Sequence, residues 1–184
     1  MEIYDNNRKG TVESMINNLK KNQYGELEGE VYVPLFDMDM EVSISNESKL
    51  AYAERCAEYF CNLPEDVLER FCKYCSRYCE ELRRVLDEED MPVPEGVEGK
   101  EILDYIAPNI LIIDEKCDES IIEFHMEMSC DWEIEHGLEL TIKDGKILYV
   151  GSYDGMPPYH TSRIEYVGHY NPNVDMNMNY ADKE

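Results

Sequence analysis

Residues 130–151 constrain the fold of this chain more than any other segment. Apolar and polar residues alternate there on both sides of an Asp-Gly pair, Asp144-Gly145. Alternation of this kind is typical of a strand with one buried face, and Asp-Gly between two such runs indicates a hairpin. The segment therefore predicts two antiparallel strands, at about 137–143 and 146–151.

A third strand is expected before this hairpin, at about residues 120–130. One set of alternate side chains is apolar and is expected to face the core: Ile122, Phe124, Met126, Met128 and Cys130. The other set, Glu123, His125 and Glu127, is expected to face solvent, because a strand sends successive side chains to opposite faces. The three strands form a C-terminal meander.

The N-terminal part of the chain predicts a second hairpin. Two β-rich runs within residues 28–45 flank the acidic segment 37–39. Pro34 indicates an edge strand or a bulge, because proline cannot donate to a ladder. Before the hairpin, residues 12–19 have the apolar spacing of a short helix within a polar segment, residues 1–26.

A pair of helices is expected between the two β regions. Ser45 or Asn46 can cap a first helix that runs to about Asn62. Pro64 suits the first turn of a second helix that ends near Leu86. Each helix carries one apolar stripe, and the short link makes the two helices antiparallel neighbours.

These elements predict an α+β fold. The N-terminal hairpin and the C-terminal meander form one antiparallel sheet, because each piece alone is too small to be stable. The antiparallel helix pair covers one face of that sheet. Along the chain we expect a polar segment with a short helix at 1–26, a single α+β domain at 27–170 and an acidic, disordered tail at 171–184.

The formal net charge of −24 on 184 residues is extreme for this size. A field of this sign repels nucleic acids and anionic membrane surfaces and attracts basic partners. The sequence shows neither a signal peptide nor the roughly 20 consecutive apolar residues that span a bilayer. We therefore expect a cytoplasmic protein with reduced cysteines that binds no nucleic acid and no membrane.

Seven cysteines are many for a cytoplasmic chain. Cys72, Cys75 and Cys79 share one helical face opposite Cys56 and Cys61, an arrangement that a soft metal or an iron–sulfur cluster could use. However, all three coincide with the apolar stripe of the second helix, and a reduced cysteine behaves as a small hydrophobe. We expect these thiols to pack in the core, without metal or other cofactor; metal binding and redox sensing are the alternatives.

The acidic turn before the hairpin is the strongest candidate site. Asp131, Glu133, Glu135 and His136 could bind a hard cation, perform acid–base chemistry or contact a partner. Alternation places the three carboxylates on an exposed strand end, where no pocket is implied. We expect residues 133–137 to form a solvated polar turn whose leading functional use is partner binding, with no metal.

Two further patterns point weakly to other chemistry. Asp37, Asp39 and Glu41 resemble the start of a calcium loop but lack its central glycine and terminal glutamate, so a hairpin turn is expected. Cys117 or Cys130 could pair with a histidine as a nucleophile, but no local signature supports such a pair. The sequence therefore predicts no catalytic residue.

Residues 132–138 carry a resemblance to a known group of proteins. They read Trp-Glu-Ile-Glu-His-Gly-Leu and precede the Asp-Gly hairpin. The chain resembles, over roughly residues 28–151, a bacterial family of unknown function with a Trp-(Asp/Glu)-x-Glu-His-Gly-(Leu/Ile) turn at this place. The resemblance implies no catalytic residues. Similar small acidic bacterial proteins include antitoxins of the immunity type, which bind and block a cognate toxin.

Three functions are compatible with these features. The first is a non-enzymatic, cytoplasmic bacterial protein that acts by protein–protein binding, as an immunity-type protein whose acids attract a basic partner. The alternative is a small metal-dependent or hydrolytic enzyme that uses the turn at Glu133, Glu135 and His136. A subunit that forms a homodimer through an exposed sheet edge is the third.

Overall fold

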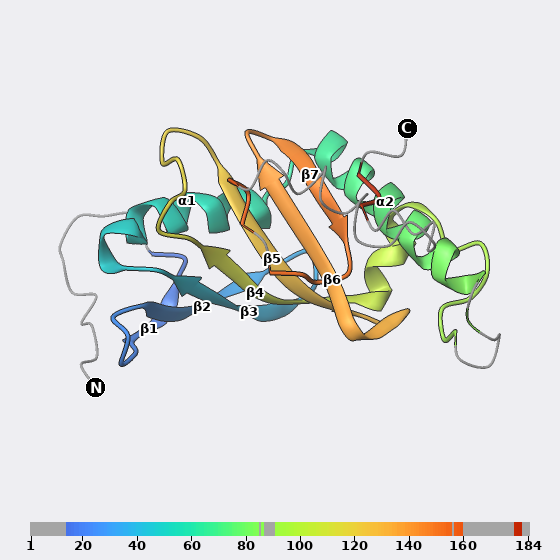
Figure 1. Ribbon diagram of the computed structural model, residues 1–184, viewed down its shortest axis with the longest axis horizontal. Helices are drawn as coiled ribbons and strands as arrows, with labels where there is room; N and C mark the ends of the chain where they lie inside the picture. The colour runs from blue at the N-terminus through green and yellow to red at the C-terminus, as the bar shows by residue number, and fades with distance from the viewer. Residues whose placement is uncertain (1–13, 85, 87–90, 156, 160–178, 182–184) are drawn as a thin grey trace, which may run out of the picture.

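One seven-stranded sheet forms the centre of the computed structural model, which describes residues 14–84, 86, 91–155, 157–159 and 179–181 (Figure 1). The strands follow in space the order in which they occur in the chain: β1 Asn17–Lys21, β2 Leu27–Val33, β3 Met38–Ile44, β4 Ile106–Ile113, β5 Glu123–Cys130, β6 Glu133–Lys143 and β7 Lys146–Gly151. All neighbouring strands are antiparallel except β3 and β4, which are parallel. The protein is therefore a mixed α+β fold with a mostly antiparallel sheet.

The expected hairpin and meander are present, as β2–β3 and β5–β7, and they belong to one sheet. The sheet is larger than the sequence predicted because β1 and β4 join it. The strand β4 links the two halves: it pairs in parallel with β3 and antiparallel with β5. A parallel pair needs a long crossover connection, and here the helices supply it.

The strand β1 replaces the helix expected at residues 12–19, as far as the described residues show. Ile16 and Leu19 are both buried although they are three residues apart. The register of β1 against β2 shifts between Asn17 and Lys20, and Asn18 has a φ of 54°. A bulge inserts one extra residue into a strand, so two buried side chains on the same face can lie three residues apart. The same spacing occurs in an amphipathic helix, which explains the wrong prediction. The domain accordingly begins before residue 27.

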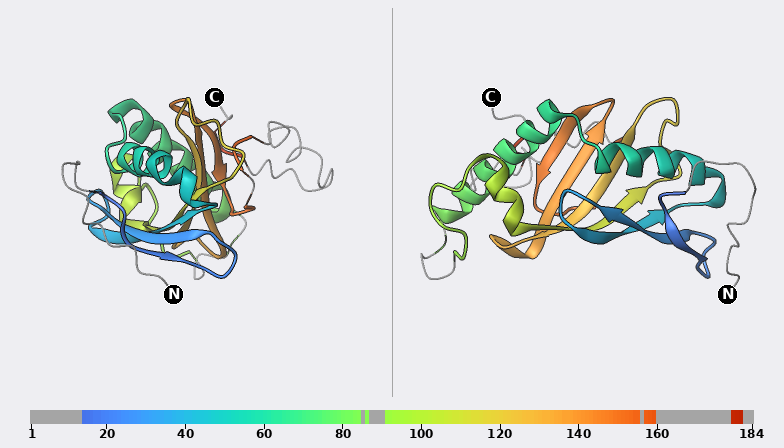
Figure 2. Two further views of the ribbon diagram at one scale, coloured as in Figure 1. Left: turned by 90° about the vertical axis from the view of Figure 1, so that its left-hand side faces the viewer. Right: turned by 180° about the vertical axis from the view of Figure 1, so that it is seen from behind.

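The crossover contains α1 (Leu50–Cys61) and α2 (Glu65–Arg83), preceded by the 3₁₀ turn η1 (Glu47–Lys49) and followed by η3 (Gly99–Tyr105). The expected antiparallel pair is wrong: α1 and α2 follow one another along the long axis of the molecule (Figure 1). Both lie on the same side of the sheet (Figure 2).

Aromatic contacts attach each helix to the sheet. Phe60 of α1 meets Phe124 of β5 edge-on, with ring centroids 6.4 Å apart. Tyr78 of α2 meets Trp132, in the turn before β6, at 6.0 Å in the same way. The apolar stripe of each helix is therefore buried against the sheet side of the core, and it does not need the other helix as a partner.

The cysteines pack as the sequence predicted. All seven are free thiols; Cys61 is half-buried and the other six are buried: Cys56, Cys72, Cys75, Cys79, Cys117 and Cys130. Their shared environment is the apolar core on the helix side and at its margins.

The expectation that Glu123 and His125 face solvent is wrong. Their side chains do point away from the helices, but Glu123 is 1% exposed and His125 is 3% exposed. The segment after β4 reaches this face, since the backbone N–H of Asp118 donates to Glu123 at 2.6 Å. The face away from the helices, called the outer face below, is thus open over the N-terminal strands and covered over part of β5 and β6.

Part of the expected disordered tail is packed in the domain. Asn179 accepts a hydrogen bond from the Val150 N–H at 3.3 Å and donates one to the Leu148 carbonyl at 2.9 Å. Tyr180 and Ala181 are buried. The remainder of residues 171–184 lies outside the described residues. Within the described chain, the helices are too short or too polar to cross a membrane.

Candidate functional site

A row of register partners places acidic side chains across the outer face. Glu30 of β2 lies opposite Glu41 of β3, and Glu41 lies beside Ile110 of β4. The row continues through Glu127 of β5 to Glu139 of β6. Partners in register point to the same face of a sheet. Four of these five residues are glutamates, so their carboxylates lie in one row across the strands.

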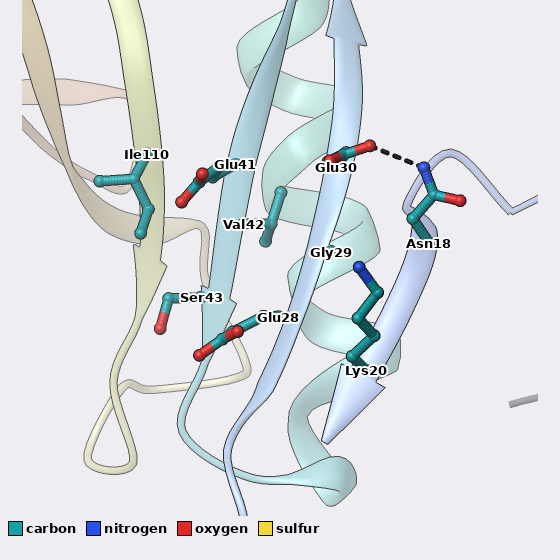
Figure 3. A pocket seen from close by; sticks show the side chains of 9 residues that line it. All are labelled: Asn18, Lys20, Glu28, Gly29, Glu30, Glu41, Val42, Ser43 and Ile110. Carbon is teal, nitrogen blue, oxygen red and sulfur yellow. Dashed lines mark hydrogen bonds between the residues drawn. The ribbon is translucent and has the colours of Figure 1, made fainter. Parts of the chain in front are cut away.

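The open end of this row is a shallow hollow of about 200 Å³ between β1 and β4 (Figure 3). Its lining residues come from four strands and are mostly polar: Asn18, Lys20, Glu28, Gly29, Glu30, Glu41, Val42, Ser43 and Ile110. Glu28 pairs in register with Lys20 on one side and Ser43 on the other. The hollow therefore combines three carboxylates and one ammonium group with two apolar residues, Val42 and Ile110.

The carboxylates of the hollow are poorly neutralised. Glu30 accepts a hydrogen bond from the Asn18 amide at 2.7 Å, and Glu28 accepts one from Asn22 at 3.0 Å. Glu41 and Glu127 make neither a hydrogen bond nor an ion pair through their side chains within the described ranges. Like charges directly opposite one another on neighbouring strands are destabilising. The Glu30–Glu41 pair therefore leaves a negative charge that a cation from outside can offset.

The acidic turn lies elsewhere, and its fold differs from the expected one. The chain turns at Asp131 and Trp132, and β6 already begins at Glu133. One Glu133 oxygen accepts the backbone N–H groups of Glu135 and His136 at 3.0 and 3.2 Å and lies 3.6 Å from the His136 ring. None of the four predicted site residues lines the hollow.

Two residues of the turn motif, Trp132 and Gly137, have structural roles. Trp132 is 2% exposed and packs on Tyr78. Gly137 has a φ of 65°, and a Cβ at this position would lie 2.5 Å from the Met128 carbonyl oxygen. The register shift between Met128 and Cys130 marks a bulge at the same place. Tryptophan and glycine therefore fix the direction of the projecting strand, on which Ile134 is 88% exposed.

A second cluster on the outer face was not predicted. The His125 Nε2 atom lies 3.2 Å from Asp114 Oδ2, and its Nδ1 atom lies 3.4 Å from Glu139 Oε1. The other Glu139 oxygen accepts the backbone N–H groups of Asp154 and Gly155 at 2.8 and 3.1 Å. The members come from separate segments, so no local sequence signal marks this cluster.

The buried groups are poorly placed for chemistry on a substrate. His125 is enclosed, and both of its ring nitrogens face carboxylates. Burial raises the pKa of the Cys72 thiol to about 11 and that of Cys130 to about 12, so few thiolates form near neutral pH. Among the described residues, no three His, Cys, Asp or Glu side chains converge as metal ligands. The acidic hollow, by contrast, is open to solvent.

Comparison with known proteins gives one result. A family model described as a domain of unknown function (DUF6985) matches residues 15–157, a range that contains all seven strands. No curated protein and no solved structure matches the chain. The expectation of a family of unknown function is confirmed at this level.

Proposed function

Because the chain belongs to the DUF6985 family, a domain of unknown function, we propose its function from its own geometry: it is a non-enzymatic protein that binds a basic partner protein through the open part of its outer face. The observation that carries the proposal is the opposed Glu30–Glu41 pair in the hollow. A lysine or arginine placed between two such carboxylates would form charge-assisted hydrogen bonds with both.

The composition of the hollow supports a long basic side chain as its occupant. Lysine and arginine bury their aliphatic stems along apolar surface while their charged ends reach polar groups. Ile110 offers such a surface next to Glu41. Arginine fits best, because its planar guanidinium can bind two carboxylate groups at once.

The field of the whole chain supports the same partner. A net charge of −24 steers a basic protein toward this surface and accelerates association at low salt. Asp131, Glu133, Glu135 and His136, on and beside the projecting start of β6, add a second acidic contact for the partner in this proposal. The helices lie on the other side of the sheet, which leaves the hollow accessible (Figure 2).

Immunity-type proteins bind and block a cognate toxin, and an acidic protein of this type would suit a basic toxin. We extend the proposal to this role: the protein is a bacterial, cytoplasmic, immunity-type inhibitor. Its support is the acidic field and the resemblance carried by residues 132–138. The enzymatic alternative at Glu133, Glu135 and His136 gains nothing from the geometry, since one Glu133 oxygen is already occupied by two backbone N–H groups.

The proposal is tested by affinity capture from the lysate of the source organism at low salt. The bait is compared with two double variants of equal charge change, Glu30→Gln with Glu41→Gln, and Glu58→Gln with Glu95→Gln as the control at exposed sites outside the hollow. We expect one basic protein to be retained by the wild type and the control and lost from the Glu30/Glu41 variant. Calorimetry on that purified protein should then show affinity that falls steeply with salt. Equal capture by both double variants, or capture of no basic protein, would reject the proposal.

A further inference from the structure

The covered part of the outer face contains the cluster that the proposed function does not use. We infer that Asp114, His125 and Glu139 form a proton-dependent clamp, which fastens the segment after β4 to the sheet while His125 carries two ring protons. The clamp joins three parts of the chain: the residue that follows β4, the middle of β5 and the middle of β6. The clamp does not depend on the basic partner protein proposed above.

The arrangement of charges favours a doubly protonated ring. Carboxylate oxygens only accept hydrogen bonds, and the two ring nitrogens of His125 each face one carboxylate, at 3.2 Å and 3.4 Å. A neutral imidazole has one N–H and one lone pair, so it can serve only one of the two. The other carboxylate would then face a lone pair at close range, which is repulsive. With both carboxylates ionised, the imidazolium is the ring form that attracts Asp114 and Glu139 together.

Burial makes the two ends of the clamp unequal. The Glu139 side chain is 0% exposed, whereas that of Asp114 is 26% exposed. Glu139 is also held by the backbone N–H groups of Asp154 and Gly155. When the ring loses a proton, the remaining N–H therefore stays on Nδ1, toward the carboxylate that water cannot reach. Asp114, which water can solvate, is released.

The electrostatic environment supports the protonated ring. Burial lowers the pKa of His125, but the contacts with Asp114 and Glu139 together raise it above its ordinary value. Other ionisable groups on the same face, within the described part of the chain, are Glu123 and Lys143, which pair at 2.8 Å, and Glu127, Tyr149 and Tyr159.

The sign of the pH effect follows from the raised pKa. A group whose pKa is higher in the folded state stabilises that state fully below its unfolded pKa, about 6.5 for histidine. This stabilisation is lost as the pH rises through the folded pKa of His125. Loosening is therefore expected on the alkaline side of neutrality, at the end that holds Asp114.

The experiment is a pH titration of the full chain by NMR, in which the histidine Cε1–H signals are followed and the His125 signal is assigned with His125→Gln. We expect His125 to titrate with a midpoint above the ordinary histidine value. Asp114→Asn should move the His125 midpoint downward, and His136→Gln should leave it unchanged. Asp114 is partly exposed, so this variant should fold even if His125→Gln does not.

Amide exchange tests the mechanical part of the inference. The backbone N–H groups of Cys117 and Asp118 bond to Asp114 and Glu123 and report on the clamped segment. After correction for intrinsic exchange rates, their protection should fall as the pH passes the His125 midpoint in the wild type, and should already be low in Asp114→Asn. A midpoint at or below the ordinary value, or protection that does not change across it, would overturn the inference.

Discussion

Tyr180 stacks on Tyr78, with ring centroids 4.8 Å apart and ring planes 23° from parallel. Tyr78 lies on α2 and also packs edge-on against Trp132. A residue close to the C-terminus therefore completes an aromatic group that connects the helix to the turn before β6.

Tyr180→Ala should lower the free energy of unfolding by about 3 kcal/mol, the cost of removing a buried aromatic ring. Tyr24→Ala is the control, because Tyr24 is 79% exposed and should change stability by less than about 0.5 kcal/mol. Urea denaturation followed by the fluorescence of Trp132 measures both. Equal midpoints for the wild type and Tyr180→Ala would show that residues 179–181 do not contribute to the fold in solution.

Gly137→Ala should destabilise the protein by about 2 kcal/mol. Two causes act together: a positive φ is unfavourable for alanine, and the new Cβ would lie 2.5 Å from the Met128 carbonyl oxygen. Gly96→Ala separates them, because Gly96 has a φ of 78° but nothing within 4 Å of a new Cβ. We expect a loss of about 1 kcal/mol there. A Gly96 variant that loses as much as the Gly137 variant would remove the steric part of the argument.

The sequence predicted those parts of the fold that depend on local signals. Alternation and the Asp144-Gly145 pair gave the β6–β7 hairpin, and both residues have the positive φ that such a turn requires. The same alternation showed which face of β5 is apolar. It could not show that the polar face at Glu123 and His125 is covered, because the covering segments are distant in sequence.

Two predictions were wrong, the helix at residues 12–19 and the antiparallel helix pair. Both depend on contacts between elements, which the sequence of one element does not show. The bulge at Asn18 gave Ile16 and Leu19 a three-residue spacing, which helices also produce. The short link after α1 suggested antiparallel neighbours, but the sheet offered each helix its own apolar surface. The hollow was not predicted as the candidate site for a similar reason: Glu30 and Glu41 become neighbours only through strand pairing.

The seven thiols should react slowly and unequally with a disulfide reagent. Burial raises the pKa of Cys56 to about 12 and that of Cys72 to about 11, so at pH 8 roughly one Cys72 thiol in a thousand is ionised. Burial also raises the pKa of Cys61, but this residue is half-buried and is expected to react first. Labelling the native protein with a chromogenic disulfide should show one faster thiol that Cys61→Ser removes, and all seven should react in urea. Several fast native thiols would contradict the core packing described above.

Glu41→Lys should stabilise the isolated protein while it weakens partner binding. The substitution converts the opposed Glu30–Glu41 pair into an opposite-charge pair, which should raise the free energy of unfolding by about 0.5–1 kcal/mol. Glu58→Lys makes the same charge change on the exposed side of α1 and is the matched control. Thermal unfolding at low and high salt measures the effect: the advantage of Glu41→Lys over Glu58→Lys should be largest at low salt, because salt screens repulsion between exposed carboxylates. If the two variants unfold at the same temperature at low salt, Glu30 and Glu41 do not repel one another, and the carboxylate pair has no unmet charge to offer a basic partner.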